Sequence, residues 1–321
     1  MKSKIRFARA VALVLIALFA ANSSSAATVT EFPIPTSPSS PFGITIGFDA
    51  NLWFTEQLGN NIGRITRQGV ITEFPLPTPG GAPRNITPGL DGSLWFTELI
   101  GNRIGRITLQ GVITEFPIPT ADSGPFYITP GFDGNLWFTE VDGNKIGRIT
   151  RQGVVTEFPV PTADSEPSGL SPGLDGNLWF TEQKGNKIGK ITRQGVITEF
   201  PVPTAASFPF GITVGFDGNL WFTELGGNQI GRITRQGVVT EFPIPTPNSA
   251  PFDITVGLDG NLWFTEFGGG QIGRITLQGV VTEFPGGSSP TGITFGFDGN
   301  LWFVEKDGNN VGRLSGVTWG P

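Results

Sequence analysis

Residues 94–116 read LWFTELIGNRIGRITLQGVITEF, and this stretch decides the fold because the chain repeats it. Its first three letters, LWF, occur seven times, and successive tryptophans lie 42 residues apart five times and 39 apart once. The seven residues are Trp53, Trp95, Trp137, Trp179, Trp221, Trp263 and Trp302. The stretch itself predicts three short strands, at 94–98, 104–108 and 112–116, separated by Gly-Asn and Gln-Gly turns.

The residues before each LWF motif supply a fourth strand. In the second repeat, Asn85-Ile-Thr-Pro-Gly leads into the turn Asp91-Gly92, and no segment between the turns has helical periodicity. Repeats of about 40–45 residues that each hold four short strands are typical of β-propellers, with one blade per repeat. We therefore predict an all-β fold, a seven-bladed β-propeller with four antiparallel strands in each blade.

The two ends of the repeat region predict how the ring closes. One TEF strand, Thr30-Glu31-Phe32, precedes the first LWF motif, and no TEF strand follows the last repeat, residues 292–315. We expect residues 28–33 to form the outer strand of the C-terminal blade. A ring closed in this way leaves only short, protected strand edges.

Residues 1–27 have the features of a secretory signal peptide. Four cations precede the apolar run at 10–21, and Ser24-Ser25-Ala26 offers small residues for cleavage, which fits equally well after Ala26 or Ala27. The apolar run is too short to span a membrane. We expect a signal peptide at 1–27, a single propeller domain at 28–321, and a protein that is secreted or periplasmic.

Charge and composition limit the partners. Without residues 1–27 the chain has 17 Lys and Arg against 27 Asp and Glu, a net charge near −10. This charge argues against nucleic acid and anionic membrane surfaces as partners. The chain contains no cysteine, so disulfides are excluded. We expect a monomer whose partner is a small molecule or a peptide.

Residues that recur in every repeat are expected to be scaffold, because a propeller has only one central site. The tryptophans are expected to pack between blades, and pairs such as Asp133-Gly134 are expected to form hairpin turns. Each LWF strand ends in a glutamate: Glu56, Glu98, Glu140, Glu182, Glu224, Glu266 and Glu305. A cation follows eight residues later: Arg64, Arg106, Arg148, Lys190, Arg232, Arg274 and Arg313. We expect a cross-strand ion pair in each blade, with a hard-cation site on the carboxylates as the alternative.

Residues that break the repeat are the better candidates for function. In a four-stranded meander, the invariant turns share one face, and the variable middle turn and the blade-to-blade connection share the other. The residue pair before each innermost strand varies most and should ring the mouth of the channel. The resulting candidates for ligand binding are Phe42, Arg84, Phe126, Tyr127, Phe210, Phe252, Asp253 and Thr291. They predict an aromatic small-molecule site, and the alternative is an apolar plug that keeps water out of the channel.

The repeat sequence resembles the virginiamycin B lyase (streptogramin B lyase) family over residues 28–315. The matching motifs are GITVGFDGNLWFTE at 211–224, GNKIGRIT at 143–150 and VITEFPLPTP at 70–79. The resemblance implies a seven-bladed propeller. Members of the family that act as lyases open the ester ring of streptogramin B antibiotics by elimination, with Mg²⁺ as the cofactor.

The resemblance also implies where a catalytic site would lie. The family's two histidines fall on Phe252 and Thr291, and a family glutamate falls on Ser289. Only Glu305 retains a family residue, and the chain contains no histidine at all. Proton abstraction beside a carbonyl needs a base whose pKa lies near the working pH. A rebuilt site would need a carboxylate such as Asp253, near Glu266 or Glu305, or a lysine, with a strongly shifted pKa.

Three functions remain open from the sequence, of which the third is a structural or surface-interaction module. The first is an exported, non-catalytic propeller that binds a ligand or partner through its variable face, with no metal site. The alternative is a lyase that opens a cyclic, streptogramin-type ester with Mg²⁺ through a rebuilt site that includes Glu305.

Overall fold

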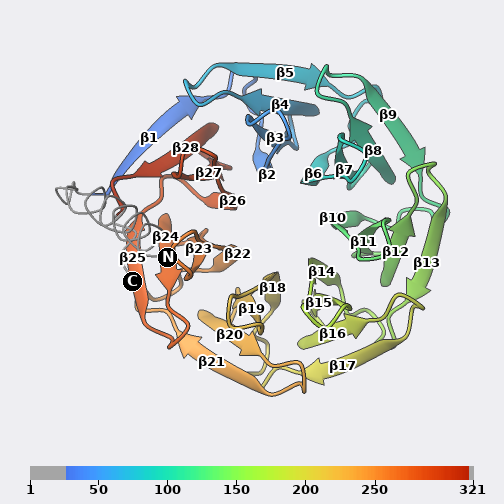
Figure 1. Cartoon of the computed structure of the whole chain (residues 1–321), viewed down its shortest axis with the longest axis vertical. Helices are drawn as coiled ribbons and strands as arrows, with labels where there is room; N and C mark the ends of the chain where they lie inside the picture. The colour runs from blue at the N-terminus through green and yellow to red at the C-terminus, as the bar shows by residue number, and fades with distance from the viewer. Residues whose placement is uncertain (1–26, 318–321) are drawn as a thin grey trace, which may run out of the picture.

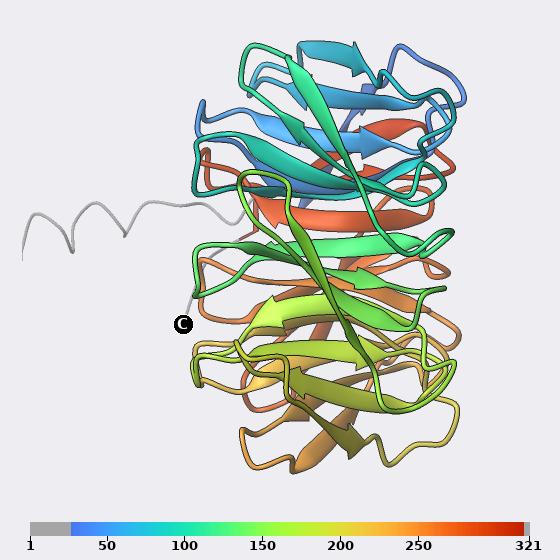
Figure 2. The ribbon, with the colours of Figure 1, turned by 90° about the vertical axis from the view of Figure 1, so that its right-hand side faces the viewer.

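A computed structural model describes residues 27–317 of the chain, so the predicted signal peptide lies outside the described residues apart from Ala27. Seven four-stranded antiparallel sheets surround a central axis (Figure 1), which confirms the predicted seven-bladed propeller. Within residues 27–317, no helix has the length and apolarity needed to cross a bilayer. Figure 2 shows the ring edge-on, with strand ends and loops at its two faces.

Each blade has an innermost, a second, a third and an outer strand. The innermost strands are β2 (Pro41–Ile46), β6 (Pro83–Pro88), β10 (Pro125–Pro130), β14 (Pro167–Pro172), β18 (Pro209–Val214), β22 (Pro251–Val256) and β26 (Pro290–Phe295). The second strands are β3 (Leu52–Glu56), β7 (Leu94–Glu98), β11 (Leu136–Glu140), β15 (Leu178–Glu182), β19 (Leu220–Glu224), β23 (Leu262–Glu266) and β27 (Leu301–Glu305). The third strands are β4 (Asn61–Ile65), β8 (Arg103–Ile107), β12 (Lys145–Ile149), β16 (Lys187–Ile191), β20 (Gln229–Ile233), β24 (Gln271–Ile275) and β28 (Asn310–Ser315). The outer strands are β5 (Ile71–Pro75), β9 (Ile113–Pro117), β13 (Val155–Pro159), β17 (Ile197–Pro201), β21 (Val239–Pro243), β25 (Val281–Pro285) and, in the seventh blade, β1 (Thr28–Pro33).

The core lies between neighbouring blades, and the second strands supply most of it. All five residues of each second strand are buried, because successive side chains point to opposite sides and both sides face another blade. In blade 3, Trp137 packs against Leu178 and Phe180 of blade 4. The ring of Phe138 lies over Gly147, where a Cβ atom would come within 2.1 Å of the ring. The expected role of the tryptophans between blades is therefore confirmed, and the repeated glycine of IGR provides the space for the phenylalanine.

The ring closes as the sequence predicts. Strand β1 pairs antiparallel with β28 in a register that runs from Thr28 opposite Ser315 to Pro33 opposite Asn310 (Figure 1). The Asn309 side chain extends this contact, because its Nδ2 donates to the backbone carbonyl of Ile34 at 3.0 Å. The first and last segments of the propeller are thus held together by backbone and side-chain hydrogen bonds.

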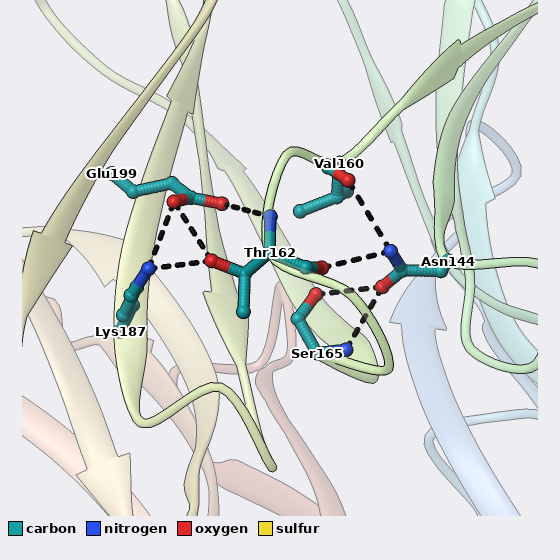
Figure 3. A network of polar contacts seen from close by, with 6 residues as sticks. All are labelled: Asn144, Val160, Thr162, Ser165, Lys187 and Glu199. Carbon is teal, nitrogen blue, oxygen red and sulfur yellow. Dashed lines mark hydrogen bonds and ion pairs between the residues drawn. The ribbon is translucent and has the colours of Figure 1, made fainter.

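Side chains of both neighbouring blades hold the connection between them in place. Figure 3 shows the connection from blade 3 to blade 4, where the Asn144 side chain donates to the Thr162 carbonyl at 2.9 Å and accepts from the Ser165 amide at 2.9 Å. On the other side, Glu199 accepts from the Thr162 amide at 2.9 Å and from Lys187 Nζ at 2.9 Å. The loops that shape the variable face are therefore fixed by hydrogen bonds on two sides.

The predicted ion pair between each LWF-strand glutamate and the cation eight residues later is wrong. The turn between the second and third strands sets a register in which Glu140 lies opposite Lys145, while Arg148 lies opposite Trp137. The Arg148 guanidinium carbon is 5.4 Å from the Trp137 ring centroid, and Nη1 is 3.7 Å from Asp133 Oδ2. The arginine therefore stacks on the tryptophan and pairs with the aspartate of the inner hairpin.

Five of the seven glutamates at the ends of the second strands are instead buried without a hydrogen-bond partner of good geometry within residues 27–317: Glu98, Glu140, Glu182, Glu224 and Glu266. Glu140 has no exposed surface, and neither of its carboxyl oxygens has a hydrogen-bond partner of good geometry among the described residues. Burial, followed by the charge of nearby Glu157, raises the pKa of Glu140 to about 8. The pKa values of Glu98, Glu182 and Glu224 also rise to about 8, mainly through burial. These groups are repeated scaffold, as expected, although the interaction that defines them is burial and not an ion pair.

Candidate ligand-binding site

A cavity of about 320 Å³ lies at one end of the central channel. Six of the seven innermost strands contribute to it, and these strands surround the axis in Figure 1. The residues that line it are Phe42, Arg84, Phe126, Phe210, Leu225, Ala250, Phe252, Phe267, Thr291 and Lys306. A concave, mainly apolar site of this size fits a small organic ligand.

Four phenylalanines from blades 1, 3, 5 and 6 form the aromatic wall. Phe252 lies 4.2 Å from Phe210 and 5.5 Å from Phe42, measured between ring centroids. Phe126 lies 5.5 Å from Phe42 and 5.6 Å from Phe210, so the four rings touch in a closed circuit. The four rings therefore contact one another around the channel and also line the cavity, and both interpretations left open by the sequence stay predictions.

Tyr127 and Asp253 do not line the cavity but join opposite blades across the channel. The Tyr127 hydroxyl donates to Asp253 Oδ1 at 2.7 Å, and the amides of Ile254 and Ile293 donate to the same carboxylate at 3.0 and 3.3 Å. Burial raises the pKa of Asp253 to about 6, against the opposing effect of these hydrogen bonds. Burial and the charge of Asp253 hold the pKa of Tyr127 well above its usual range. The pair is thus a buried cross-channel contact.

Two cations line the cavity. Arg84 lies over the rings of Phe42 and Phe126, with its guanidinium carbon 4.3 and 5.0 Å from the two centroids. Burial lowers the pKa of Arg84 to about 10, so the guanidinium stays charged at neutral pH. Lys306 Nζ lies 5.8 Å from the ring centroid of Phe267. Cations over aromatic faces are stabilised by the ring quadrupole.

The four positions implied by the family resemblance do not converge on one site. Phe252 and Thr291 line the cavity, but the Thr291 hydroxyl is directed at the Pro41 carbonyl, 3.2 Å away. Ser289 Oγ donates to Asp307 Oδ2 at 2.6 Å and does not line the cavity. Glu305 is also outside the lining, where its Oε2 accepts from the Ser288 amide at 3.1 Å and burial raises its pKa.

The donor set does not fit Mg²⁺. Residues 27–317 contain no grouping of three or more histidine, cysteine or acidic side chains that could hold a metal ion. Asp253 is already hydrogen-bonded to a tyrosine and two amides, and no glutamate is among the groups that shift its pKa. Mg²⁺ needs several oxygen ligands around it, which this cavity does not offer from side chains.

Sequence reasoning missed four residues of the lining: Leu225, Ala250, Phe267 and Lys306. Three of these come directly after the glutamate that ends a second strand, in blades 5, 6 and 7. The equivalent residues in the first four blades are Gln57, Leu99, Val141 and Gln183. The residue after this glutamate therefore varies among blades as clearly as the residue pair before each innermost strand does. That variability was the signal that could have identified it.

The fold and the cavity define a seven-bladed propeller with a cavity of small-molecule size at its channel mouth. The sequence model of the Virginiamycin B lyase family matches residues 21–149. The crystal structure of selenomethionine-substituted virginiamycin B lyase from Staphylococcus aureus is 45% identical with a TM-score of 0.86, covering 90% of this chain and 99% of that one. The chain belongs to the virginiamycin B lyase family.

Two further structures and one further sequence of this family are also similar to the chain. A streptogramin B lyase structure is 42% identical with a TM-score of 0.87, over 92% of this chain and 99% of that one. A catalytically inactive histidine-to-alanine variant of the Staphylococcus aureus enzyme, solved with quinupristin, is 45% identical with a TM-score of 0.86, over 90% of this chain and 99% of that one. The virginiamycin B lyase of Bacillus licheniformis is 46% identical over 41 residues, which span 13% of this chain and 14% of that protein.

Proposed function

We propose that this chain is an exported, monomeric, non-catalytic member of the family that binds a small ligand in the cavity at the channel mouth. The observation that carries the proposal is the composition of the cavity. Its walls are mainly aromatic and aliphatic, with two cations and one threonine as the only polar side chains. Sites of this kind bind small molecules by burying an apolar body and orienting it with a few polar groups.

The same lining argues against lyase chemistry. The chain has no histidine, and the residues at the family positions are Phe252, Ser289 and Thr291. A phenylalanine and a hydroxyl that faces a backbone carbonyl cannot take up a proton at neutral pH. Asp253 directly follows Phe252 in the sequence, and its carboxylate is hydrogen-bonded to Tyr127. The raised pKa values of Asp253 and Glu266 are what a rebuilt lyase site would need, but neither side chain lines the cavity.

Export is supported by the sequence of residues 1–27, with its cationic start, apolar run and small residues before Ala27. The negative charge of the remaining chain supports a partner other than nucleic acid or an anionic membrane. Fluorescence of the periplasmic and culture fractions, with a fluorescent protein fused at the C-terminus, would locate the product.

Binding can be tested with the neutral aromatic probe N-phenyl-1-naphthylamine, whose fluorescence rises in apolar sites. Leu225 lines the cavity, whereas Leu58 is exposed in a loop that follows the second strand of blade 1 and is outside the lining. We expect Leu225→Trp to fill part of the cavity and weaken probe affinity by about tenfold, which corresponds to about 1.4 kcal/mol. The matched Leu58→Trp variant should bind like the parent protein. Equal affinity in the parent and Leu225→Trp proteins would refute a binding role for the cavity.

A further inference from the structure

The charges that line the cavity are of one sign. Arg84 and Lys306 are its only ionisable lining residues, and no acid is among the ten lining residues. The chain as a whole carries more acidic than basic residues. A positive concavity in an acidic protein is therefore a local feature that composition does not explain. Cavities lined by one sign of charge attract ligands of the opposite sign.

Arg84 has no counter-ion among residues 27–317. No carboxylate among the described residues lies within 4.0 Å of its guanidinium, and its Nε is buried without a hydrogen-bond partner. Four of the repeated arginines of the scaffold differ, since Arg64, Arg106, Arg148 and Arg274 each lie within 4.0 Å of an aspartate of the inner hairpin. A partly buried cation that lacks a partner costs free energy, which an anion in the cavity would recover.

Among the acids near the channel, Asp253 and Glu305 accept hydrogen bonds from other groups, whereas the buried carboxyl oxygens of Glu224 and Glu266 have no hydrogen-bond partner of good geometry in the described part of the chain. Asp253 accepts hydrogen bonds from Tyr127 and two backbone amides, and Glu305 accepts one from the Ser288 amide. On another blade, Glu166 forms an ion pair with Lys184 at 2.5 Å. None of these carboxylates neutralises the cations of the cavity.

Both cations occupy positions where the repeat is broken. Arg84 stands where blades 1, 3, 5 and 6 have phenylalanine, and Lys306 stands where blades 5 and 6 have Leu225 and Phe267. Their positions place each cation beside an aromatic ring, with Arg84 over Phe42 and Lys306 near Phe267. A ligand that contacts the rings would therefore also come within reach of the charges.

We propose that the cavity binds a small molecule that combines an apolar, ring-containing body with an anionic group, which Arg84 and Lys306 hold while the phenylalanines contact the body. This inference rests on the ligand-binding function proposed above. Arg84 provides a planar fork of donors that suits a carboxylate, sulfonate or phosphate group, and Lys306 adds a second charge. The aromatic wall excludes water from the apolar part of the ligand.

A matched pair of probes tests the charge requirement. 1-Anilinonaphthalene-8-sulfonate has the ring system of N-phenyl-1-naphthylamine with one added sulfonate, so the difference between their affinities reports on the anion. We expect Arg84→Gln to weaken the sulfonate probe by about 10-fold or more, because charge-assisted hydrogen bonds are lost, and to change the neutral probe by less than about twofold. Lys306→Gln should cause a smaller loss for the sulfonate probe. Arg84→Lys should keep a preference for it.

Controls separate this inference from the proposed function. Lys184→Gln removes a lysine outside the cavity and should change neither affinity, and circular dichroism should show that every variant is folded. If Arg84→Gln and Lys306→Gln leave the sulfonate probe unchanged while Leu225→Trp weakens both probes, the cavity is a binding site without anion selectivity and the inference fails. If Leu225→Trp changes neither probe, the proposed function fails as well.

Discussion

The spaces between blades and the mouth of the channel are both lined by aromatic side chains, but the two regions use them differently. On the side of each blade that packs against a neighbour, the tryptophan stacks on the outer-strand phenylalanine of the same blade, and the seven pairs have centroids 5.3–5.6 Å apart and interplanar angles of 15–27°. At the mouth, four phenylalanines meet once, mostly edge-to-face, beside a cavity of about 320 Å³. Contacts that occur in every blade hold the ring together, and the contacts that occur once leave room for a ligand.

The largest expected effect on stability comes from removing the β1–β28 pairing, which joins the first and last strands of the propeller. Deletion of residues 28–35 removes β1, the partner of β28, and exposes backbone donors and apolar surface of blade 7. We expect aggregation or a loss of most of the stability, measured by thermal unfolding of the protein without residues 1–27. Removing residues 318–321 leaves the β1–β28 pairing intact and should have little effect. A deletion variant that melts with the parent protein would contradict the role of β1 in closure.

A smaller effect is expected from the buried glutamates, and it depends on pH. The pKa of Glu140 is raised from its ordinary 4.5 to about 8 in the folded protein, first by burial and then by Glu157. The folded state therefore binds more protons than the unfolded state between these values. Stability from this group is fully present below about 4.5 and is lost as the pH rises through about 8. Because several blades share this feature, we expect the free energy of unfolding to fall from about pH 5 to about pH 9.

The variant Glu140→Gln should reduce that pH dependence, since an amide does not ionise. We expect the free energy of unfolding of the variant, relative to that of the parent protein, to be higher at pH 9 than at pH 5 by on the order of 2 kcal/mol. Urea unfolding at both pH values measures this difference. Glu98→Gln and Glu182→Gln should behave alike, because the three positions are equivalent. If the difference between parent and variant is the same at both pH values, Glu140 does not ionise in this range. A change in probe binding confined to one variant would place that glutamate in a site and not in the scaffold.

The fold could be predicted from the sequence almost completely, including the seven blades and the strand that closes the ring. Each repeat contains its own turn residues and its own strand-forming runs. The site could be read only in part. Six of the eight predicted residues line one cavity, whereas Tyr127 and Asp253 bond to each other across the channel. That contact joins residues 126 positions apart in sequence, and its partners depend on which blades face each other across the axis. The repeat pattern does not report side-chain contacts across the axis.

The error on the glutamates has a simple geometric cause. An eight-residue separation was expected to place Glu140 opposite Arg148, but the hairpin register pairs residues about its turn and puts Trp137 there. Lys306 was missed for a different reason, since it lies one residue beyond a strand that otherwise repeats. Positions just outside a conserved-looking motif within the chain can vary from blade to blade and still face the channel.

The central claim is that the mouth of this propeller binds a ligand without the chemistry of its lyase relatives. The most direct measurement is to incubate the purified protein, without residues 1–27, with Mg²⁺ and a streptogramin B antibiotic, and to follow the cyclic ester by chromatography over hours. The Staphylococcus aureus lyase serves as the positive control. Loss of a general base alone typically lowers a rate by about 10²–10⁴-fold, and here Phe252, Ser289 and Thr291 replace all but one of the family positions. We expect the ester ring to remain closed at the level of the protein-free control. Ring-opened product above that level would contradict the claim and would direct attention to Asp253, Glu266 and Glu305 as the base.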